Sequence, residues 1–300
     1  MNIGLLVGGD SPERDVSLSS GKAILKALES LGNNVIVLDP KDGIHLLENQ
    51  IVAVDLIFNA LHGGDGENGN IAAYLESLGV LFTGSGKDSS RNCMDKNISK
   101  KIVSENEINT PKWVLKQTLP SDDIIKDIGF PMVVKPNDLG STIGLSVAKN
   151  YKELSGAYDS ALEFTDSIMF ESFIQGREIT VPIIGERSFP VVEIIPKNDL
   201  YDYECKYTAG MSDYICPANI DIDLSDHIKN EALKIHKLLN CDHYSRVDFL
   251  LGDKDKLWFL EINTLPGMTE TSLLPKSLKA DGYSFSDVIQ MIIDEATNNS

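Results

Sequence analysis

The stretch RVDFLLGDKDKLWFLEINTLPGMT, residues 246–269, decides how this chain is organised. Two apolar segments, over residues 245–251 and 257–263, have the composition of β-strands. The polar residues 253–255 between them are typical of a short turn. The sequence therefore predicts a β-hairpin here.

The polar side chains of this predicted hairpin fall on one face of each strand. Side chains two positions apart on a strand point the same way, so Arg246 and Asp248 share a face of the first strand. By the same spacing, Glu261 and Asn263 share a face of the second. The hairpin thus gathers two carboxylates, an amide and a guanidinium group.

The register of the hairpin decides whether the two carboxylates meet. A four-residue turn that pairs Gly252 with Leu257 sets Asp248 opposite Glu261. The neighbouring register would set the Asp248 carboxylate against Leu260, an apolar side chain. We therefore expect the first register.

Adjacent carboxylates in an apolar setting repel each other and are costly to desolvate. A hard cation removes that cost, and carboxylate and amide oxygens are ligands that Mg²⁺ takes together with phosphate and water. The adjoining turn, residues 264–269, would present backbone N–H groups beside the same face. We expect a metal and phosphate site; the alternative is an exposed hairpin with a solvated polar face.

Composition limits the class of protein. The chain has 300 residues, enough for about two domains, and 42% of them are hydrophobic. Its net charge of −18 argues against nucleic-acid or anionic-membrane partners, which need a basic surface. The N-terminal apolar run, residues 3–7, is too short for a signal peptide, so we expect none; no membrane-length apolar run follows, and the four cysteines form no CxxC pair. We expect a cytoplasmic enzyme.

The first third of the chain alternates strands and helices. Strands are predicted over residues 3–7, 35–38 and 56–61, with a helix over residues 16–30 between the first two. This spacing favours a parallel sheet covered by helices. The glycines do not form a GxGxxG motif, so no dinucleotide site is indicated.

Glycine-rich segments follow several of the predicted strands. Residues 62–69, HGGDGENG, come after the third strand, where open α/β sheets bind ligands. A further strand over residues 80–83 leads to a helix that carries residues 94–96. Taken alone, the loop 62–69 could equally be a flexible surface loop.

From residue 111 onward the sequence is richer in strands. Residues 131–136 form a strand that ends in Lys135, and residues 140–144 form a glycine turn that could clamp phosphate. Taken alone, Lys135 could equally be a surface lysine before a turn. Residues 168–174 and 179–184 are expected to pair with each other, and residues 190–195 add a strand.

The later segments complete the expected organisation. Residues 201–217 are long, aromatic and polar without strand or helix periodicity, as in a functional lid. Helices are predicted over residues 224–239 and 284–296.

Several motifs, in order along nearly the whole chain, resemble one family. They are GGDSPERDVSLSSG (8–21), LHGGDGENG (61–69), TGSG…MDK (83–96), VVKPNDLGSTIG (133–144), YDYECKYTAG (201–210) and RVDF…LEINTLPGMTETSLLPK (246–276). These motifs resemble those of the D-alanine–D-alanine ligases of the ATP-grasp superfamily. Two positions depart from the family pattern: Asn68, where Asp is more frequent, and Thr142, where Ser is usual.

The resemblance implies an α/β fold with an N-terminal parallel-sheet domain followed by a central and C-terminal ATP-grasp pair. The expected divisions are residues 1–110, 111–175 and 176–300. An ATP site between a small sheet and the central domain would hold two Mg²⁺ ions, with Mn²⁺ as a substitute. The nucleotide contacts would be Lys96, Lys135, Thr142, Glu171, Phe173, Ile174 and Glu178, and the metal ligands Asp248, Glu261 and Asn263.

The same resemblance implies a binding site for two D-alanine molecules. The catalytic residues would be Glu13, Ser141, Lys206, Tyr207, Arg246 and Gly267, and the substrate contacts His62, Ser272 and Leu273. ATP would convert one D-alanine to an acyl phosphate, which the amine of the second would attack, for peptidoglycan precursor synthesis. The implied assembly is a homodimer. The competing hypotheses are a ligase with another acceptor, such as D-lactate, and an ATP-binding regulatory module without turnover.

Overall fold

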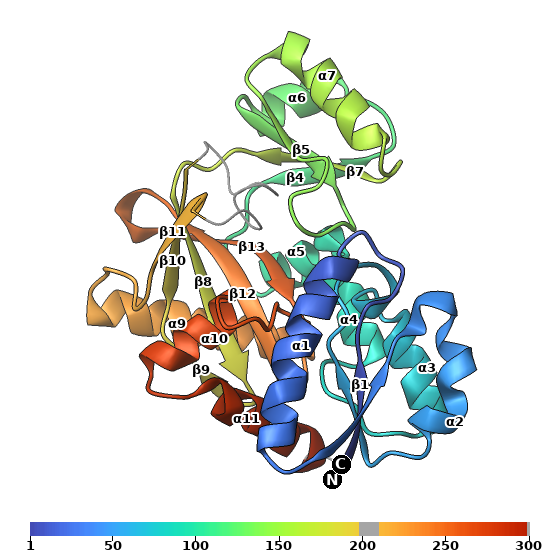
Figure 1. Ribbon diagram of the computed structural model, residues 1–300. Coiled ribbons are helices and arrows are strands. Elements are labelled where there is room, and N and C mark those ends of the chain that lie inside the picture. The colour runs from blue at the N-terminus through green and yellow to red at the C-terminus, as the bar shows by residue number, and fades with distance from the viewer. Residues whose placement is uncertain (198–209, 299–300) are drawn as a thin grey trace.

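The computed structural model describes residues 1–197 and 210–298. In this part of the chain three separate sheets form the framework, of three, four and six strands. Figure 1 shows the four-stranded sheet at the top, the six-stranded sheet in the middle and the three-stranded sheet at the lower right. The α/β class and the N-terminal parallel sheet are confirmed.

The N-terminal sheet has the order β2-β1-β3 and is parallel throughout. Its strands are β1 (Asn2–Leu6), β2 (Asn34–Leu38) and β3 (Leu56–Asn59), and α1 (Arg14–Ser30) connects the first two. Residues 3–6 of β1 are buried, as expected for a strand in the middle of a covered sheet. The ends of β1 and β3 therefore open at the same edge of the sheet.

The strand predicted over residues 80–83 is reduced to a single bridge between Ile57 and Phe82. Ile57 N–H donates to the Leu81 carbonyl at 2.8 Å, and Thr83 N–H donates to the Ile57 carbonyl at 2.9 Å. The chain then turns at Gly84, whose φ of 102° is readily adopted by glycine and strained for other residues. The turn ends the pairing.

Helix α2 (Glu48–Ile51) lies between β2 and β3, and α3 (Asn70–Leu78), α4 (Lys87–Met94) and α5 (Lys96–Glu105) follow β3. The single helix predicted across residues 94–96 is two helices, because Asp95 adopts an extended conformation between them. Its carboxylate accepts the N–H of Ile98 at 2.9 Å and so caps α5. The break presents Lys96 at the start of a new helix.

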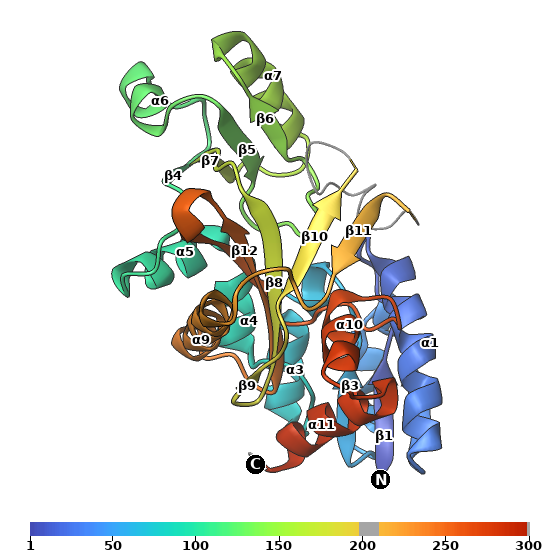
Figure 2. The same ribbon diagram turned by 90° about the vertical axis from the view of Figure 1, so that its left-hand side faces the viewer.

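The four-stranded sheet has the order β4-β7-β5-β6 and is antiparallel. Its strands are β4 (Trp113–Lys116), β5 (Met132–Pro136), β6 (Ser146–Ala148) and β7 (Ile168–Ser172), with helices α6 (Asp122–Ile128) and α7 (Tyr151–Leu162). Both helices lie on one side of this sheet (Figure 2). The buried residues of its core lie between Ile125 and Phe170, with Val114 and Ile124 among the partly buried side chains packed against them, so the sheet is packed by its own residues and helices.

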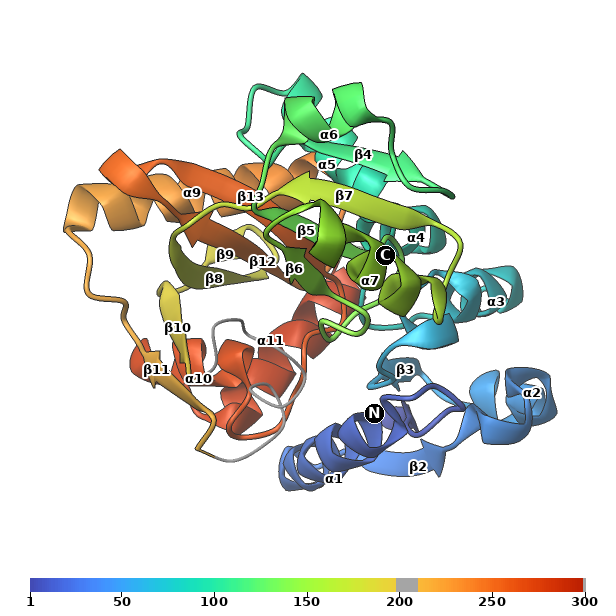
Figure 3. The same ribbon diagram turned by 90° about the horizontal axis from the view of Figure 1, so that it is seen from above.

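The six-stranded sheet has the order β11-β10-β8-β12-β13, with β9 paired to β8. Its strands are β8 (Arg177–Ile184), β9 (Arg187–Ser188), β10 (Val192–Pro196), β11 (Ser212–Ile215), β12 (Tyr244–Leu251) and β13 (Leu257–Asn263). Figure 3 shows the four-stranded sheet above the β12–β13 part of this sheet, with the N-terminal sheet to one side.

Two expectations for this region are wrong. β7 and β8 do not pair with each other: β7 lies between β4 and β5, whereas β8 lies between β10 and β12. The segment between them leads from one sheet to the other, so the chain does not turn back. The supposedly aperiodic stretch 201–217 contains a strand, β11, which pairs with β10 along the edge of the sheet.

The predicted pairing of the hairpin carboxylates is confirmed, although the strand register near the turn differs from the expected one. Asp248 lies opposite Glu261, and Arg246 lies opposite Asn263. At the turn, however, Leu251 rather than Gly252 pairs with Leu257, and the register shifts by one residue between Asp248 and Phe249. A β-bulge thus restores the register that brings the carboxylates together.

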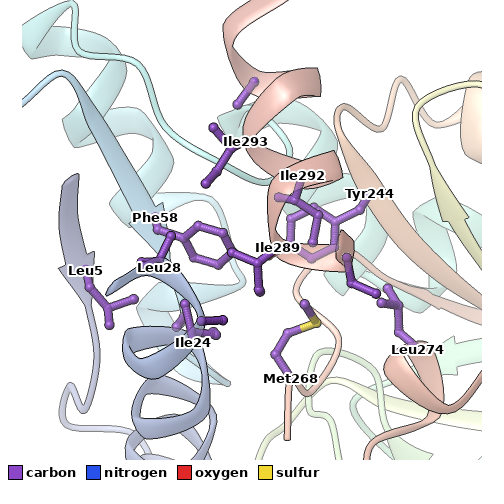
Figure 4. Close-up of a cluster of buried hydrophobic side chains, with 14 of the residues drawn as sticks. Leu5, Ile24, Leu28, Phe58, Tyr244, Met268, Leu274, Ile289, Ile292 and Ile293 are labelled. Carbon is purple, nitrogen blue, oxygen red and sulfur yellow. The ribbon is translucent and has the colours of Figure 1, made fainter. Parts of the chain in front are cut away.

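The last helices are α9 (Ile222–Leu238), α10 (Leu273–Ala280) and α11 (Phe285–Asn298). Side chains of α11, near the C-terminus, share one buried cluster with side chains of β1, α1 and β3 in the N-terminal sheet. Figure 4 shows Phe58 and Ile24 packed toward Ile289 and Ile292. The C-terminal helix therefore fixes the N-terminal sheet beside the six-stranded one. Within the described ranges, no helix combines the length and apolarity needed to cross a membrane.

Candidate active site

A small cavity lies between the four-stranded sheet and the hairpin. Its volume is about 120 Å³. Of the predicted residues, its lining contains Lys96, Lys135, Thr142, Glu178, Asp248 and Glu261. Apolar side chains such as Ile179 and Phe249 complete the wall. A lining that combines apolar side chains with cations and carboxylates suits a nucleotide, whose base and phosphates need different surroundings.

Lys96 is one of the residues that line the small cavity. Its ammonium group donates to the Leu139 carbonyl at 2.7 Å and lies 3.2 Å from the Glu261 carboxylate. The side chain is only 8% exposed, against 30% for Glu261. The two residues thus hold the loop after β5 to the hairpin.

Lys135 is a buried residue, which excludes the surface alternative left open by its sequence. Its ammonium group lies 3.1 Å from one oxygen of Glu171, and that of Lys100 lies 2.6 Å from the other. Burial alone would raise the pKa of the Glu171 carboxyl, but attraction by the two lysines outweighs it and leaves the pKa below its usual value. Glu171 is therefore an anion held between two cations.

Asp248 is held in place by its own strand and by β8. The Arg246 guanidinium group makes a two-pronged contact with the Asp248 carboxylate, at 2.9 and 2.8 Å. The Thr180 hydroxyl donates to the same carboxylate at 2.5 Å. These contacts orient Asp248, which is one of the residues that line the small cavity.

The loop after β5 has an unusual backbone. Ser141 and Thr142 have φ values of 55° and 60°, a left-handed conformation that residues with a Cβ rarely adopt. The Ser141 hydroxyl donates to the Glu13 carboxylate at 2.5 Å, which joins this loop to the start of α1. Such local strain occurs where a loop must present its groups to a ligand.

A larger cavity of about 710 Å³ adjoins the small one. Of the predicted residues, its lining contains Glu13, His62, Ser141, Arg246, Asn263, Gly267, Ser272 and Leu273. Lys96 and Glu261 line both cavities. Carboxylate, guanidinium, imidazole and hydroxyl groups here suit a small zwitterionic ligand.

His62 lies at the floor of the larger cavity and is buried. One ring nitrogen contacts the Ser20 hydroxyl at 3.1 Å, and the other lies 3.6 Å from the Glu67 carboxylate. Ser20 also accepts the N–H of Met268 at 3.2 Å. His62 is therefore tied to the turn that follows the hairpin.

That turn is held by short polar contacts. The Asn263 amide oxygen accepts the N–H of Leu265 at 2.9 Å. The Ser272 hydroxyl accepts the N–H of Thr269 at 3.1 Å and contacts the Thr269 hydroxyl at 2.8 Å. Ser272 is also the N-cap residue of α10, where free N–H groups favour an anion.

Some predicted residues are not brought to these two cavities. Glu171, Phe173 and Ile174 are absent from both linings, so their contact with adenine stays a prediction. Lys206 and Tyr207 lie outside the described residues, and so does most of the predicted lid.

Comparison with known proteins identifies the family. The profile described as "D-ala D-ala ligase C-terminus" matches residues 101–294. The D-alanine–D-alanine ligase of Halalkalibacterium halodurans is 43% identical over 303 aligned residues, covering 98% of each chain. The chain belongs to the D-alanine–D-alanine ligase family.

Solved structures support this assignment. The D-alanine–D-alanine ligase from Bacillus anthracis complexed with ATP is similar with a TM-score of 0.88 at 32% identity, covering 100% of this chain and 98% of that one. The VanG D-Ala:D-Ser ligase from Enterococcus faecalis has a TM-score of 0.86 at 28% identity, covering 99% of each chain. The ATP-grasp fold expected from the motifs is confirmed.

The two departures from the ligase pattern keep the local structure. The Asn68 amide oxygen accepts the N–H of Asn70 at 3.0 Å, a contact that a carboxylate could also make. Thr142 retains a hydroxyl beside the small cavity. Neither departure removes a polar group from the site.

The sequence analysis missed two residues of this ligase site. Thr180 could not be found locally, because its contact with Asp248 depends on the pairing of β8 with β12. Lys100 carried a signal that was overlooked: it lies four residues after Lys96 and therefore on the same helix face.

Proposed function

We propose that the chain joins two D-alanine molecules to D-alanyl-D-alanine, with ATP as the energy source, through a D-alanyl phosphate intermediate. The product would serve peptidoglycan precursor synthesis and hence cell shape. The observation that carries this proposal is the meeting of the two cavities at Lys96 and Glu261. A nucleotide in one cavity and an amino acid in the other would meet at that point.

The nucleotide side would take ATP in the small cavity. Lys96 and Lys135 would contact phosphate oxygens, and Thr142 would cover them from the strained loop. Glu178 would reach the ribose, and residues 171–174 the adenine edge. The cations offset the charge that phosphoryl transfer concentrates on the transferred group.

The hairpin fits the two Mg²⁺ ions that the family implies, with Mn²⁺ as a substitute. Asp248 and Glu261 lie opposite each other and both face the small cavity, with side chains 17% and 30% exposed. Among the described residues, no group of three His, Cys, Asp or Glu side chains could hold a metal unaided. The Asn263 amide and ATP phosphates would complete the shell. When bound, Mg²⁺ would neutralise phosphate charge.

The substrate side would take both D-alanine molecules in the larger cavity. Glu13 would bind the ammonium group of the first, with His62 near it. The first carboxylate would attack the terminal phosphorus of ATP and release ADP. Arg246 and the Gly267 N–H would stabilise the negative oxygen that forms when the second amine attacks the acyl carbon. That intermediate would then collapse to the amide as phosphate and a proton leave.

The second D-alanine would place its carboxylate at Ser272 and Leu273, at the N-terminus of α10. Lys206 would neutralise the transferred phosphoryl group, and Tyr207 would fasten the lid through Ser141 and Glu13. A closed lid would protect the acyl phosphate from water.

The proposed organisation divides the chain at residues 110 and 175, in keeping with the three sheets. We further propose a cytoplasmic homodimer without nucleic-acid or membrane partners. The charge of −18 supports the exclusion of anionic partners. Light scattering in solution tests the dimer.

The deciding assay measures phosphate release from ATP and Mg²⁺ with D-alanine, L-alanine, D-serine or D-lactate as the added substrate. We expect release with D-alanine alone and with mixtures that contain it, and none with L-alanine. D-alanyl-D-alanine should be the main product when D-alanine competes with D-lactate or D-serine at equal concentration. ATP binding without phosphate release would favour the regulatory module, and a mixed product would favour another acceptor.

A further inference from the structure

Lys100 is a buried cation with a demanding set of neighbours. None of its side chain is exposed. Its ammonium group lies 2.6 Å from the Glu171 carboxylate, donates to the Thr110 hydroxyl at 2.6 Å and lies 5.2 Å from the centre of the Trp113 ring. Three different parts of the chain therefore meet at one nitrogen.

Such an arrangement is a poor source of stability. Removing an ammonium group from water is costly, and an ion pair returns that cost only with good geometry and additional hydrogen bonds. Burial lowers the pKa of Lys100 to about 8, although attraction by Glu171 and Glu261 raises it and repulsion by Lys135 lowers it further. An apolar residue would fill the same space without this desolvation cost, which indicates that the charge of Lys100 has a role in the site.

The contacts of Lys100 link the two sides of the small cavity. On one side, the Thr110 hydroxyl donates to the Phe259 carbonyl of β13 at 2.9 Å, and the N–H of Phe259 donates to the Asn109 carbonyl at 2.8 Å. Glu261 follows two residues later on the same strand and faces the cavity. Lys100 is thus anchored to the strand that carries a proposed metal ligand.

On the other side, Lys100 holds Glu171 of β7, and Glu171 holds Lys135 of β5. Each oxygen of Glu171 faces a different lysine, so the carboxylate has little freedom to rotate. A second contact between α5 and the same sheet runs from the Trp113 indole N–H to the Asn97 amide oxygen at 3.0 Å. The four-stranded sheet is therefore attached to the hairpin through α5.

We propose that Lys100 is a positioning residue that sets the ammonium group of Lys135, through Glu171, at a fixed place relative to the β12–β13 hairpin. Lys100 does not touch the nucleotide in this scheme. It keeps the phosphate-binding lysine on one sheet in register with the carboxylates on the other. The proposal rests on the proposed function of the small cavity as an ATP site.

The first test compares Lys100→Met with Lys101→Met. Lys101 lies next to Lys100 on α5 but is exposed, so its variant is a matched control. We expect the Kd for ATP, measured by calorimetry with Mg²⁺ and without D-alanine, to rise about tenfold or more in Lys100→Met only. The KM for D-alanine should stay within about twofold of the wild-type value, since Lys100 does not line the larger cavity.

The second test needs no Lys100 variant and therefore survives if Lys100→Met does not fold. The chain has two tryptophans, so Trp113 is the only tryptophan that remains in a Trp258→Phe protein. Its ring lies beside the Lys100 ammonium group. Its fluorescence should change with a midpoint near pH 8 as the ammonium group loses its proton. The Kd for ATP should rise over the same pH range, because Glu171 then keeps only Lys135 as a charged partner.

The outcomes separate this inference from the proposed function. If the wild-type protein does not bind ATP, the proposed function and the inference both fail. If the wild type binds ATP and Lys100→Met binds it as tightly as Lys101→Met, only the inference is overturned. An ATP affinity that is constant across the Trp113 transition would overturn it in the same way.

Discussion

At the scale of single residues, Glu261 occupies the point on which the proposed chemistry depends. It lines both cavities, lies opposite Asp248 and pairs with Lys96. Its carboxylate is also partly exposed, so its charge is not needed to hold a dry core together. Its loss should therefore affect turnover much more than folding.

We expect Glu261→Gln to lower turnover by about a hundredfold or more, because lost charge stabilisation raises the barrier by several kcal/mol. The measurement is the rate of phosphate release at saturating ATP, Mg²⁺ and D-alanine, with circular dichroism to check the fold. Asp253→Asn, in the exposed turn of the same hairpin, is the matched control. A folded Glu261→Gln protein with near-normal turnover would remove Glu261 from the metal site.

At the scale of secondary-structure elements, α9 is joined to β12 by a buried polar pair. His236 of α9 contacts the Ser245 hydroxyl of β12 at 2.7 Å. Burial lowers the pKa of His236 to about 4, with smaller effects from Lys237, Glu186 and His243. The imidazole is therefore neutral in the folded protein at pH 5, where it is protonated in the unfolded chain.

This difference makes the stability of the fold depend on pH. The unfolded state binds more protons than the folded state between pH 6.5 and 4, so stability is lost as the pH falls through that range. We expect His236 to account for a loss of about 3 kcal/mol between pH 7 and pH 4. His236→Asn should remove this part of the dependence in urea unfolding, whereas His227→Asn, on an exposed part of α9, should retain it. Parallel pH curves for wild type and His236→Asn would contradict the assignment.

At the scale of the whole molecule, ATP would bridge sheets that have separate cores. The four-stranded sheet packs around one buried cluster, and the hairpin belongs to another. A ligand that contacts both stabilises the folded chain by mass action, by about 2.7 kcal/mol at a hundredfold excess over Kd. The melting temperature should therefore report ATP binding.

We expect ATP with Mg²⁺ to raise the melting temperature by several degrees, and EDTA to reduce that increase. In Lys135→Ala the increase should shrink, and the melting temperature without ATP should also fall because Glu171 loses a partner. Lys152→Ala, an exposed change on α7 beside the same sheet, should do neither. An unchanged ATP response in Lys135→Ala would show that this lysine does not bind the nucleotide.

Local sequence pattern was enough to predict most strands and helices and the carboxylate face of the hairpin. The strand period of two fixes which side chains share a face, and this property needs no distant contact. The same pattern failed where a local capping contact decided the outcome, as at Asp95, or where a bulge replaced regular pairing, as at Phe249. In both places the free energy of the observed backbone conformation is close to that of the regular one, so the local pattern does not distinguish them.

The sequence by itself determined the family, the α/β class and the residue types of the site, because these reside in ordered motifs along the chain. Only the tertiary structure decided which residues meet. Ser141 contacts Glu13 across 128 positions, β7 and β8 enter different sheets, and Lys100 reaches Glu171. Such contacts depend on how whole surfaces pack and on which charges become buried. The spacing of neighbouring residues in the sequence determines neither property.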